Sequence, residues 1–325
     1  MSVLSQPRFH DEAAAFEYLE SMIWADGVVC PHCGIVGGRV YKLEGVRSKP
    51  GKKHPEGVVR HGLKKCGECR KQFTAKVGTV FEDAKLPLHK MLQAVHLMMS
   101  SKKGISSHQL SRILEVQYNS AWFLAHRIRE AMREGELTPF GSGGGSVEVD
   151  ETYIGREPGK EKAKGGVAHK MKVLSLVDRN SGRARSMVVD DTTAATIAPL
   201  VEANIVAEAR LLTDQSKIYK QVGGKFAEHG IVNHQIGEYV SFANPTVHTN
   251  TIEGYFSIFK RGMKGVYQHC SKKHLHRYLA EFDFRYTNRA ALGINDVARS
   301  HEAVKGIVGK RLTYRSAGFR PAASA

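Results

Sequence analysis

Three acidic residues lie in sequence contexts that could support catalysis: Asp150 in VEVDETYIG, Asp214 in RLLTD and Glu253 in HTNTIEGYFSIFKRG. Carboxylates that converge from separate elements repel one another unless a cation lies between them, and Mg²⁺ prefers such oxygen ligands. Two such ions can activate an attacking hydroxyl and stabilise the leaving oxygen of a displacement at phosphorus. We therefore predict a Mg²⁺ or Mn²⁺ site for phosphoryl transfer at Asp150, Asp214 and Glu253.

Lys260 follows Glu253 by seven residues, which is almost two helical turns, so both side chains share one helix face. We expect Lys260 to contact DNA phosphates at this catalytic site. Each acid also has a structural interpretation. Glu253 could pair with an Asn250 cap in a capping box, Asp214 could cap a helix or turn, and Asp150 could be a surface strand residue.

Four of the five cysteines form two CxxC pairs, at Cys30, Cys33, Cys66 and Cys69. Two converging CxxC pairs supply the tetrahedral thiolate shell of structural Zn²⁺, and the alternative is a redox CxxC. We expect residues 34–65 to form an elaborated hairpin whose Lys and Arg side chains contact phosphates or remain solvated. The fifth cysteine, Cys270, has no partner by spacing.

The charge balance points to a polyanionic partner. The 325 residues hold 48 Lys and Arg against 32 Asp and Glu, giving a net charge of +16 and a pI near 9.6. Such a field attracts nucleic acid and gives salt-dependent binding, so double-stranded DNA is the expected partner. No apolar run of about 18 residues and no secretory leader is evident, so we expect a cytoplasmic protein without membrane contact.

The elements before residue 140 are predicted to be helical outside the cysteine region. A helix should begin near Asp11, and residues 87–134 read as three helices, the second opened by Ser106 or Ser107. The link VQYN between the last two fits a helix-turn-helix that directs Arg127 and Arg129 toward DNA, although helix pairs also serve only for packing. The Gly/Ser run at 140–146 is expected to be a flexible linker.

From residue 147 the apolar pattern changes to that of strands. VEVDETYIG, KMKVLSLVDR and ARSMVVDD predict an antiparallel meander, followed by a helix, the strand RLLTD, a short strand near GIVNH and a helix from about 249. A right-handed crossover places the RLLTD strand beside the first strand, which brings Asp214 near Asp150. The expected sheet is mixed, with helices packed on it.

Two basic segments of this half are candidates for DNA contact. The Gly-rich stretch 155–170 is expected to lie on DNA or to be an idle loop. After Glu253, the chain mixes cations, including Arg261 and Lys264, with Tyr267, Tyr278 and Tyr286. These tyrosines could stack on bases of an opened DNA end or belong to a helix core.

CPHCG with KCGECRKQFT, VEVDETYIG, LLTDQSKIY and the block from HTNTIEGYF to RYTNR together resemble the bacterial insertion-sequence transposases of the zinc-ribbon DDE type. The resemblance spans about residues 10–295. It implies an RNase H-like catalytic domain with Asp150, Asp214 and Glu253 as metal ligands, Lys260 as the following basic residue, and the four cysteines as zinc ligands. The third metal position is Glu in some such families and Asn in others, so Asn250 could share it with Glu253.

The expected fold is multidomain α+β: an N-terminal zinc ribbon, a helical helix-turn-helix segment, and an RNase H-like mixed β-sheet flanked by helices. The expected divisions are 1–82, 83–139, the linker 140–146, the catalytic domain 147–300 and a tail at 301–325 whose tip is disordered. The predicted function is DNA transposition, with Mg²⁺-dependent strand cleavage and joining by a homo-oligomer on paired element ends. The alternatives are a nuclease without strand transfer and a non-catalytic DNA-binding regulator.

Overall fold

The chain folds into two compact units. The computed structural model describes residues 2–52, 54–135, 138–162 and 166–313. Unit 1 comprises Met1–Met98, Ser107–Ala131 and Ser300–Ala325, and unit 2 comprises Met99–Ser106 and Met132–Arg299. The predicted helical segment 83–139 therefore contributes to both units instead of forming a domain of its own.

Unit 1 begins with a helix and a small antiparallel sheet. Helix α1 (Glu12–Ile23) starts where predicted, because the Asp11 side chain accepts a hydrogen bond from the Ala14 N–H at 2.7 Å. Strands β1 (Val40–Lys42), β2 (Lys64–Cys66) and β3 (Gln72–Phe73) follow in that order in the sheet. Bridges at Arg47–Val59 and Gly51–His54 extend the arm between β1 and β2, which confirms the predicted hairpin.

The other helices of unit 1 come from distant parts of the sequence. They are α2 (Leu88–Met99), α3 (Ser107–Leu114), α4 (Tyr118–Ala131) and α9 (Asp296–Lys305), of which α2 and α9 extend into the residues assigned to unit 2. Helices α3 and α4 pack together across a short turn in which Glu115 takes a φ of 51°. This is the predicted helix-turn-helix. Helix α9 runs past residue 300 and Ile307 is buried, so the expected tail starts later than 301; residues 314–325 lie outside the described part.

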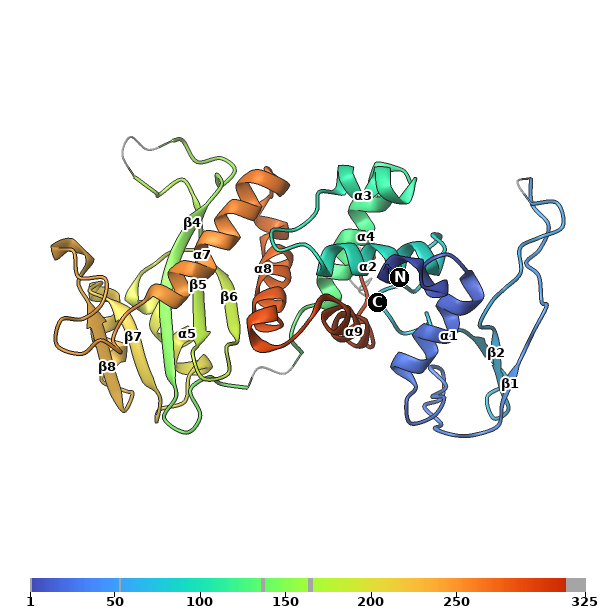
Figure 1. The fold of residues 1–325 in the computed structure, drawn as a ribbon, viewed down its shortest axis with the longest axis horizontal. Coiled ribbons are helices and arrows are strands. Elements are labelled where there is room, and N and C mark those ends of the chain that lie inside the picture. Colours follow the sequence, from blue (N-terminus) through green and yellow to red (C-terminus); the bar gives the residue numbers. More distant parts are fainter. Residues whose placement is uncertain (1, 53, 136–137, 163–165, 314–325) are drawn as a thin grey trace, which may run out of the picture. The chain divides into compact units, whose positions relative to one another are not determined.

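A five-stranded sheet forms the centre of unit 2 (Figure 1). Its strands are β4 (Ser146–Ile154), β5 (Met171–Asp178), β6 (Ala184–Val189), β7 (Arg210–Asp214) and β8 (Glu228–Val232). The order across the sheet is β6-β5-β4-β7-β8; the first three strands are antiparallel, and β7 is parallel to both β4 and β8. This antiparallel meander extended by two parallel strands is the RNase H-like topology, and it confirms the predicted meander and the predicted β4–β7 pairing.

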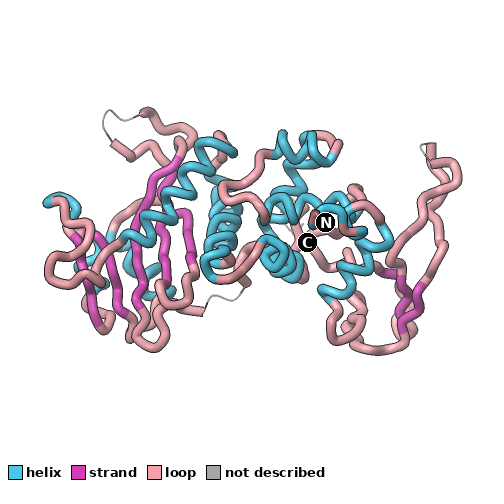
Figure 2. Tube along the Cα trace, viewed as in Figure 1, coloured by secondary structure: helices cyan, strands magenta, loops and turns pink. Residues whose placement is uncertain are grey.

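Helices cover both faces of the sheet (Figures 1 and 2). On one face α7 (Asn250–Gly262) and α8 (Lys272–Thr287) bury Ile154, Val173 and Val177 with their own aromatic residues. On the other face α5 (Ala194–Asn204) packs on Val147, Val149 and Leu174. Because side chains alternate along a strand, Glu148 and Asp150 point to the α7 face, while Glu151 points to the α5 face.

Shorter helical turns connect these elements. They are η1 (Val3–Ser5) and η2 (Pro7–Phe9) in unit 1, and η3 (Lys217–Tyr219), α6 (Lys220–Gly223), η4 (His234–Ile236), η5 (Met263–Tyr267) and η6 (Ala290–Leu292) in unit 2. Of these, η5 is a π-helical turn that continues α7. Short 3₁₀ turns are common as connectors between longer elements and at the ends of helices.

The Gly/Ser run before β4 is an ordered turn, so the prediction of a flexible linker is wrong. Phe140 is buried, and its N–H donates to the Asn204 carbonyl at 2.8 Å. The Gly143 N–H donates to Glu208 Oε1 at 2.7 Å. At Gly141, with a φ of 85°, an added Cβ would lie 2.3 Å from the Ala209 Cβ. Glycine is therefore needed there for close packing against the sheet.

Within the described ranges, no helix combines the length and the apolar character that a membrane crossing requires.

Candidate active site

The sheet register brings Asp150 and Asp214 to the same level. Glu148 pairs with Leu212 in the parallel β4–β7 ladder, and Asp150 and Asp214 each follow two residues later. Two residues is one full strand period, so both carboxylates lie on the α7 face. Adjacent strands are about 4.8 Å apart, so the backbones of the two acids are close neighbours where β7 ends. The Asp214 carboxylate also accepts the Ser216 N–H at 3.0 Å, which turns the chain away from the sheet.

Glu253 reaches the same place from the first turn of α7. The preceding residue, Ile252, donates its N–H to the buried Glu148 carboxylate at 2.7 Å, which ties the start of α7 to β4 two residues before Asp150. The Glu253 Oε1 lies 3.4 Å from the Thr249 hydroxyl and 3.5 Å from His234 Nε2. Asp214 and Glu253 are thus close enough for their charges to act on Asp150, although the three carboxylates come from separate elements.

Arg179 completes the anchor of α7. Its Nε donates to Glu148 Oε1 at 2.6 Å, and its terminal nitrogens donate to the carbonyl oxygens of Thr246 and His248, each at 2.7 Å. One ion pair therefore fixes β4, the end of β5 and the segment that leads into α7. The sequence analysis gave Glu148 no role; its position two residues before Asp150, hence on the same face of a strand, was the available signal.

Burial and neighbouring negative charge both disfavour the ionised form of Asp150. Burial, together with the charges of Glu151, Asp214 and Glu253, raises the pKa of Asp150 to about 8, although the hydrogen bond from the Glu151 N–H acts in the opposite direction. A bound cation would reverse this effect, because it stabilises the ionised carboxylates. Oxygen-only ligands and mutual repulsion both fit a hard divalent ion such as Mg²⁺.

Glu151 is a fourth acid beside this centre, half-buried like Asp150, and the sequence analysis did not identify it. Burial raises its pKa to about 7 although it accepts a hydrogen bond from the Tyr219 hydroxyl. The charge of Asp214 also raises the pKa of Glu151, although the Glu151 side chain points to the opposite, α5 face of the sheet. Tyr219 thus holds Glu151 away from the Asp150 face. The adjacent acids in the motif DET were the signal for this residue.

The predicted basic residues of α7 differ in their setting. Lys260 is half-buried, its Nζ lies 5.6 Å from the Phe256 ring centroid, and burial lowers its pKa, although Asp150 and Glu253 counter that effect. Lys260 is therefore close enough for these acids to act on its charge, while its predicted contact with DNA phosphate stays a prediction. Arg261 and Lys264 are exposed and can reach a phosphate backbone.

The capping box proposed for Asn250 does not form. Thr249 is the N-cap of α7, and Asn250 is its exposed first residue. The Glu253 N–H donates to the Thr249 carbonyl at 3.1 Å as an ordinary helical bond. The Glu253 carboxylate is 42% exposed, which leaves it accessible to a ligand.

The four cysteines of unit 1 form a metal site. Their Sγ atoms lie within 4.8 Å of one another, with 3.7 Å between Cys30 and Cys69 and 3.8 Å between Cys33 and Cys66. A tetrahedron with Zn–S bonds of about 2.3 Å has edges of about 3.8 Å, so these thiols fit Zn²⁺. Burial opposes ionisation of Cys30, but N–H groups of His32 and Cys33 outweigh it and lower the pKa to about 7.

Within the described ranges, the cysteines form the one such cluster of three or more His, Cys, Asp or Glu ligand atoms. The three carboxylates of unit 2 are not gathered as tightly.

The prediction that Arg127 and Arg129 face DNA is wrong, since both are buried. The Arg127 guanidinium donates to the carbonyl oxygens of Val80 and Glu82 at 2.8 and 2.7 Å and lies over the Phe123 ring. Arg129 is 0% exposed. Both side chains belong to the interior of the folded chain. The exposed residues of this region are on α3 and at the start of α4, including Arg112, Tyr118 and Asn119.

The tyrosines expected to stack on bases are core residues. Tyr278 is buried, and Tyr267 packs edge-on against it with ring centroids 4.8 Å apart. The Tyr286 ring packs on Tyr255 at 5.2 Å. These contacts support the alternative of a helix core, so base stacking must be sought elsewhere.

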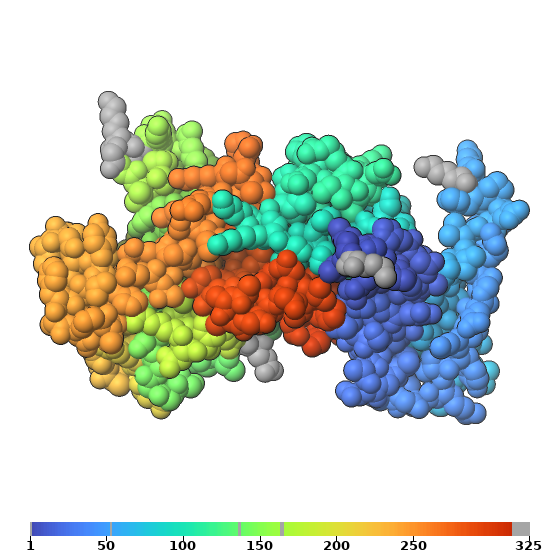
Figure 3. Space-filling model, in the orientation of Figure 1, coloured from blue at the N-terminus to red at the C-terminus, as the bar shows by residue number. Residues whose placement is uncertain are grey.

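The β4–β5 loop projects from the sheet in the space-filling view, in light green (Figure 3). The two ends of this loop are joined by a hydrogen bond from the Glu157 N–H to the His169 carbonyl at 2.7 Å. The Glu157 carboxylate also binds Lys272 at 2.6 Å and Lys160 at 2.7 Å, and these bonds lower its pKa to about 2. The DNA contact expected for 155–170 stays a prediction, and residues 163–165 lie outside the described part.

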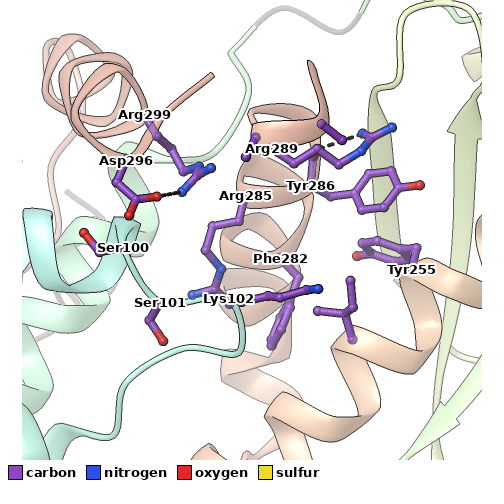
Figure 4. Close-up of a pocket in the computed structure, with 13 residues that line it drawn as sticks. Ser100, Ser101, Lys102, Tyr255, Phe282, Arg285, Tyr286, Arg289, Asp296 and Arg299 are labelled. Atoms are coloured by element: carbon purple, nitrogen blue, oxygen red, sulfur yellow. Dashed lines mark hydrogen bonds and ion pairs between the residues drawn. The ribbon is translucent and has the colours of Figure 1, made fainter. Parts of the chain in front are cut away.

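A cavity of about 340 Å³ lies elsewhere in unit 2, between α7, α8 and residues 100–102 (Figure 4). Its walls are mainly Tyr255, Phe282 and Tyr286, and none of the predicted catalytic residues lines it. Its arginines are engaged by the protein: Arg299 donates to the Met99 carbonyl and to Asp296, each at 2.7 Å. Because none of the predicted metal ligands lines it, the cavity is a weaker candidate than the acidic centre.

Two protein-family models match this chain. The transposase zinc-ribbon domain family matches residues 10–72, and the ISXO2-like transposase domain family matches residues 143–287. A protein of the transposable element ISH50 from Halobacterium salinarum, itself uncharacterized, is 26% identical over 299 residues, covering 85% of this chain and 91% of the relative.

Two solved structures show low similarity. The catalytic core domain of BIV integrase is 14% identical, with a TM-score of 0.29 over 43% of this chain and 82% of that chain. A chain of the simian T-cell lymphotropic virus intasome in complex with the PP2A regulatory subunit B56 gamma is also 14% identical, with a TM-score of 0.29 over 54% and 63%. The fold assignment rests on the strand order instead. With its four-cysteine ribbon, its RNase H-like sheet and both family matches, the chain belongs to the insertion-sequence transposases that join a zinc ribbon to a DDE-type domain.

Proposed function

We propose that this protein binds the ends of its insertion sequence and catalyses metal-dependent cleavage and joining of DNA. The observation that carries the proposal is the convergence of Asp150, Asp214 and Glu253 on one face of the sheet, with Lys260 facing the same centre. A zinc ribbon and a helix-turn-helix in unit 1 supply further surfaces for duplex DNA.

Asp150, Asp214 and Glu253 are the residues that would hold Mg²⁺. When bound, two such ions lower the pKa of the attacking hydroxyl and stabilise the oxygen that leaves phosphorus. The anchor of α7 on Glu148 holds the third carboxylate at a fixed place relative to the first. Such preorganisation reduces the rearrangement needed when substrate binds.

Lys260 would neutralise a phosphate next to the reacting one, and the exposed Arg261 and Lys264 would hold the strand farther along. In the first step water attacks the phosphodiester at the element end, the P–O3′ bond breaks and a 3′-hydroxyl is released. In the second step this hydroxyl attacks a target phosphodiester, whose own P–O3′ bond breaks. The number of phosphodiester bonds is conserved in the joining step, so it needs no external energy source.

The direct test uses labelled element-end DNA, target plasmid and Mg²⁺. We expect joined products from wild-type protein, and a loss of at least about a hundredfold for Asp150→Asn, Asp214→Asn or Glu253→Gln. Glu202→Gln, which alters an exposed ion pair on α5, is the matched control and should retain activity. Equal joining by Asp150→Asn would remove the catalytic assignment.

Cleaved but never joined ends would indicate a nuclease instead. Binding of the ends without any metal-dependent product would indicate a regulator.

A further inference from the structure

The segment between β8 and α7 displays large apolar side chains to solvent. Ile236, Tyr239 and Phe242 are 66%, 59% and 80% exposed, and Phe242 is the most exposed of the large hydrophobic residues that the structure describes. Single exposed apolar residues are common, but a cluster within seven positions is a sign of a binding surface.

This segment is built as a defined loop. The Glu238 carboxylate accepts the N–H groups of Asn233 and Phe242, both at 3.0 Å, and so closes the loop from inside. The Ser241 N–H donates to the Val247 carbonyl at 2.9 Å. Hydrogen bonds therefore fix the backbone while the rings are left exposed.

The same loop is bonded to the residues around the acidic centre. The His234 N–H donates to Gln215 Oε1 at 3.0 Å, directly after Asp214 in sequence. The His234 ring lies between Glu253, at 3.5 Å from its Oε1, and the Tyr239 ring, at 5.3 Å between centroids. Only one imidazole ring separates a candidate metal ligand from the exposed aromatic surface.

We propose that Tyr239 and Phe242 form a stacking platform for an unpaired nucleobase next to the phosphodiester that is cut or joined. This inference rests on the proposed function and adds a substrate-binding site to it. Aromatic rings stack on any base, and this contact offsets the stacking lost when a DNA end opens. The net charge of +16 and the closeness to the acidic centre favour DNA over a protein partner as the occupant.

The test compares two DNA probes: a blunt duplex, and the same duplex with a short single-stranded 3′ extension that carries 2-aminopurine at its first unpaired position. Affinities are measured by fluorescence anisotropy without Mg²⁺. Wild-type protein should prefer the extended probe and quench its 2-aminopurine. The Tyr239→Ala/Phe242→Ala variant should lose about tenfold or more of this preference and the quenching, with unchanged affinity for the blunt duplex.

Two variants serve as controls. Tyr239→Phe/Phe242→Trp, which keeps both rings, should retain the preference and the quenching. Leu292→Ala, which removes a 42% exposed side chain elsewhere in unit 2, should behave as wild type. Phe242→Ser alone removes the ring at the most exposed position, so it tests the platform without a packing defect if the double variant misfolds.

An unchanged preference and unchanged quenching in the alanine variant would overturn the platform. The platform would also be overturned if the alanine variant kept its preference for the extended probe but its sedimentation coefficient without DNA differed from that of wild type. That result would assign the patch to contact between protein copies. Failure of the proposed function has a different readout: wild-type protein would give no Mg²⁺-dependent cleavage or joining, whatever its preference between the probes.

Discussion

Asp150 combines burial with repulsion from its neighbours, and this makes its ionisation costly in the metal-free protein. Its pKa is about 8 in the folded protein, against an ordinary value near 3.9 in an unfolded chain. The folded state therefore binds the proton more tightly. The resulting stabilisation is present below about pH 4 and is lost as pH rises to about 8.

We predict that Asp150→Asn makes the Mg²⁺-free protein more stable than wild type at pH 8, by at least about 1 kcal/mol, because it removes the buried charge. The difference should shrink toward pH 4. Urea unfolding at both pH values in zinc-containing buffer measures it, with Glu202→Gln as the surface control. A variant that is less stable than wild type at pH 8 would contradict this account of Asp150.

The effect of breaking the Glu148–Arg179 ion pair is a second prediction about single residues. Glu148 is fully buried and Arg179 is mostly buried, so removing one partner leaves an uncompensated charge. Glu148→Gln should destabilise unit 2 by about 3–5 kcal/mol, and the double variant Glu148→Gln/Arg179→Gln by less than the sum of the single changes. A double-mutant cycle by chemical unfolding checks this. Additive effects would show that the pair does not act as a unit, whereas Lys305→Gln in the exposed pair with Glu302 should cost no more than about 1 kcal/mol.

Among the structural elements, the zinc ribbon depends most on a bound metal ion for its folding. Its strands are only two or three residues long, and its core is small and centres on Cys30, Cys66 and Phe73. Structural Zn²⁺ contributes about 10–16 kcal/mol in small domains, which exceeds what such a core supplies.

We predict that Cys66→Ser or a strong chelator unfolds the ribbon but leaves unit 2 folded. Limited proteolysis should then cut within residues 28–73, and the zinc content should fall from about one ion per chain. Cys270→Ser, which changes the cysteine outside the cluster, should keep its zinc and its protease resistance. Full zinc content in Cys66→Ser protein would contradict the four-cysteine site.

The elements also show what a sequence can and cannot predict. Strand alternation and the crossover rule correctly predicted that Asp150 and Asp214 would be neighbours, because both rules act locally or on topology alone. Helix periodicity correctly found α4 but could not tell which of its faces is buried, so Arg127 and Arg129 were assigned to DNA. The linker prediction failed for a similar reason: Gly141 is required by close packing against Ala209, which composition does not reveal.

Long-range contacts explain the other features of the structure that the sequence did not predict. Glu148 and Ile252 are 104 positions apart, and only the folded chain shows that one anchors the other. The exposure of Tyr239 and Phe242, and the burial of Tyr278, likewise depend on how α7 and α8 pack on the sheet. From residue types alone, Tyr278 was a stacking candidate and Tyr239 was not considered.

For the whole molecule, the excess of positive charge predicts strong salt dependence of DNA binding. Each neutralised phosphate contributes about −0.9 to the slope of log K against log salt concentration. Lys264→Ala should weaken binding similarly for all sequences and reduce the magnitude of the slope by about 1, because Lys264 is exposed in η5, directly after α7. Arg127→Met should instead lower the thermal stability of unit 1, because its guanidinium bonds are internal. Anisotropy titrations at several salt concentrations and thermal melts separate these outcomes; an unchanged slope for Lys264→Ala would exclude its phosphate contact.

The most direct measurement of the central claim is anomalous diffraction from crystals of the protein soaked in Mn²⁺. We expect anomalous density bounded by the carboxylates of Asp150, Asp214 and Glu253, lost in Asp150→Asn crystals, with separate zinc density at the four cysteines. Manganese bound elsewhere, with those three carboxylates free of metal, would contradict it.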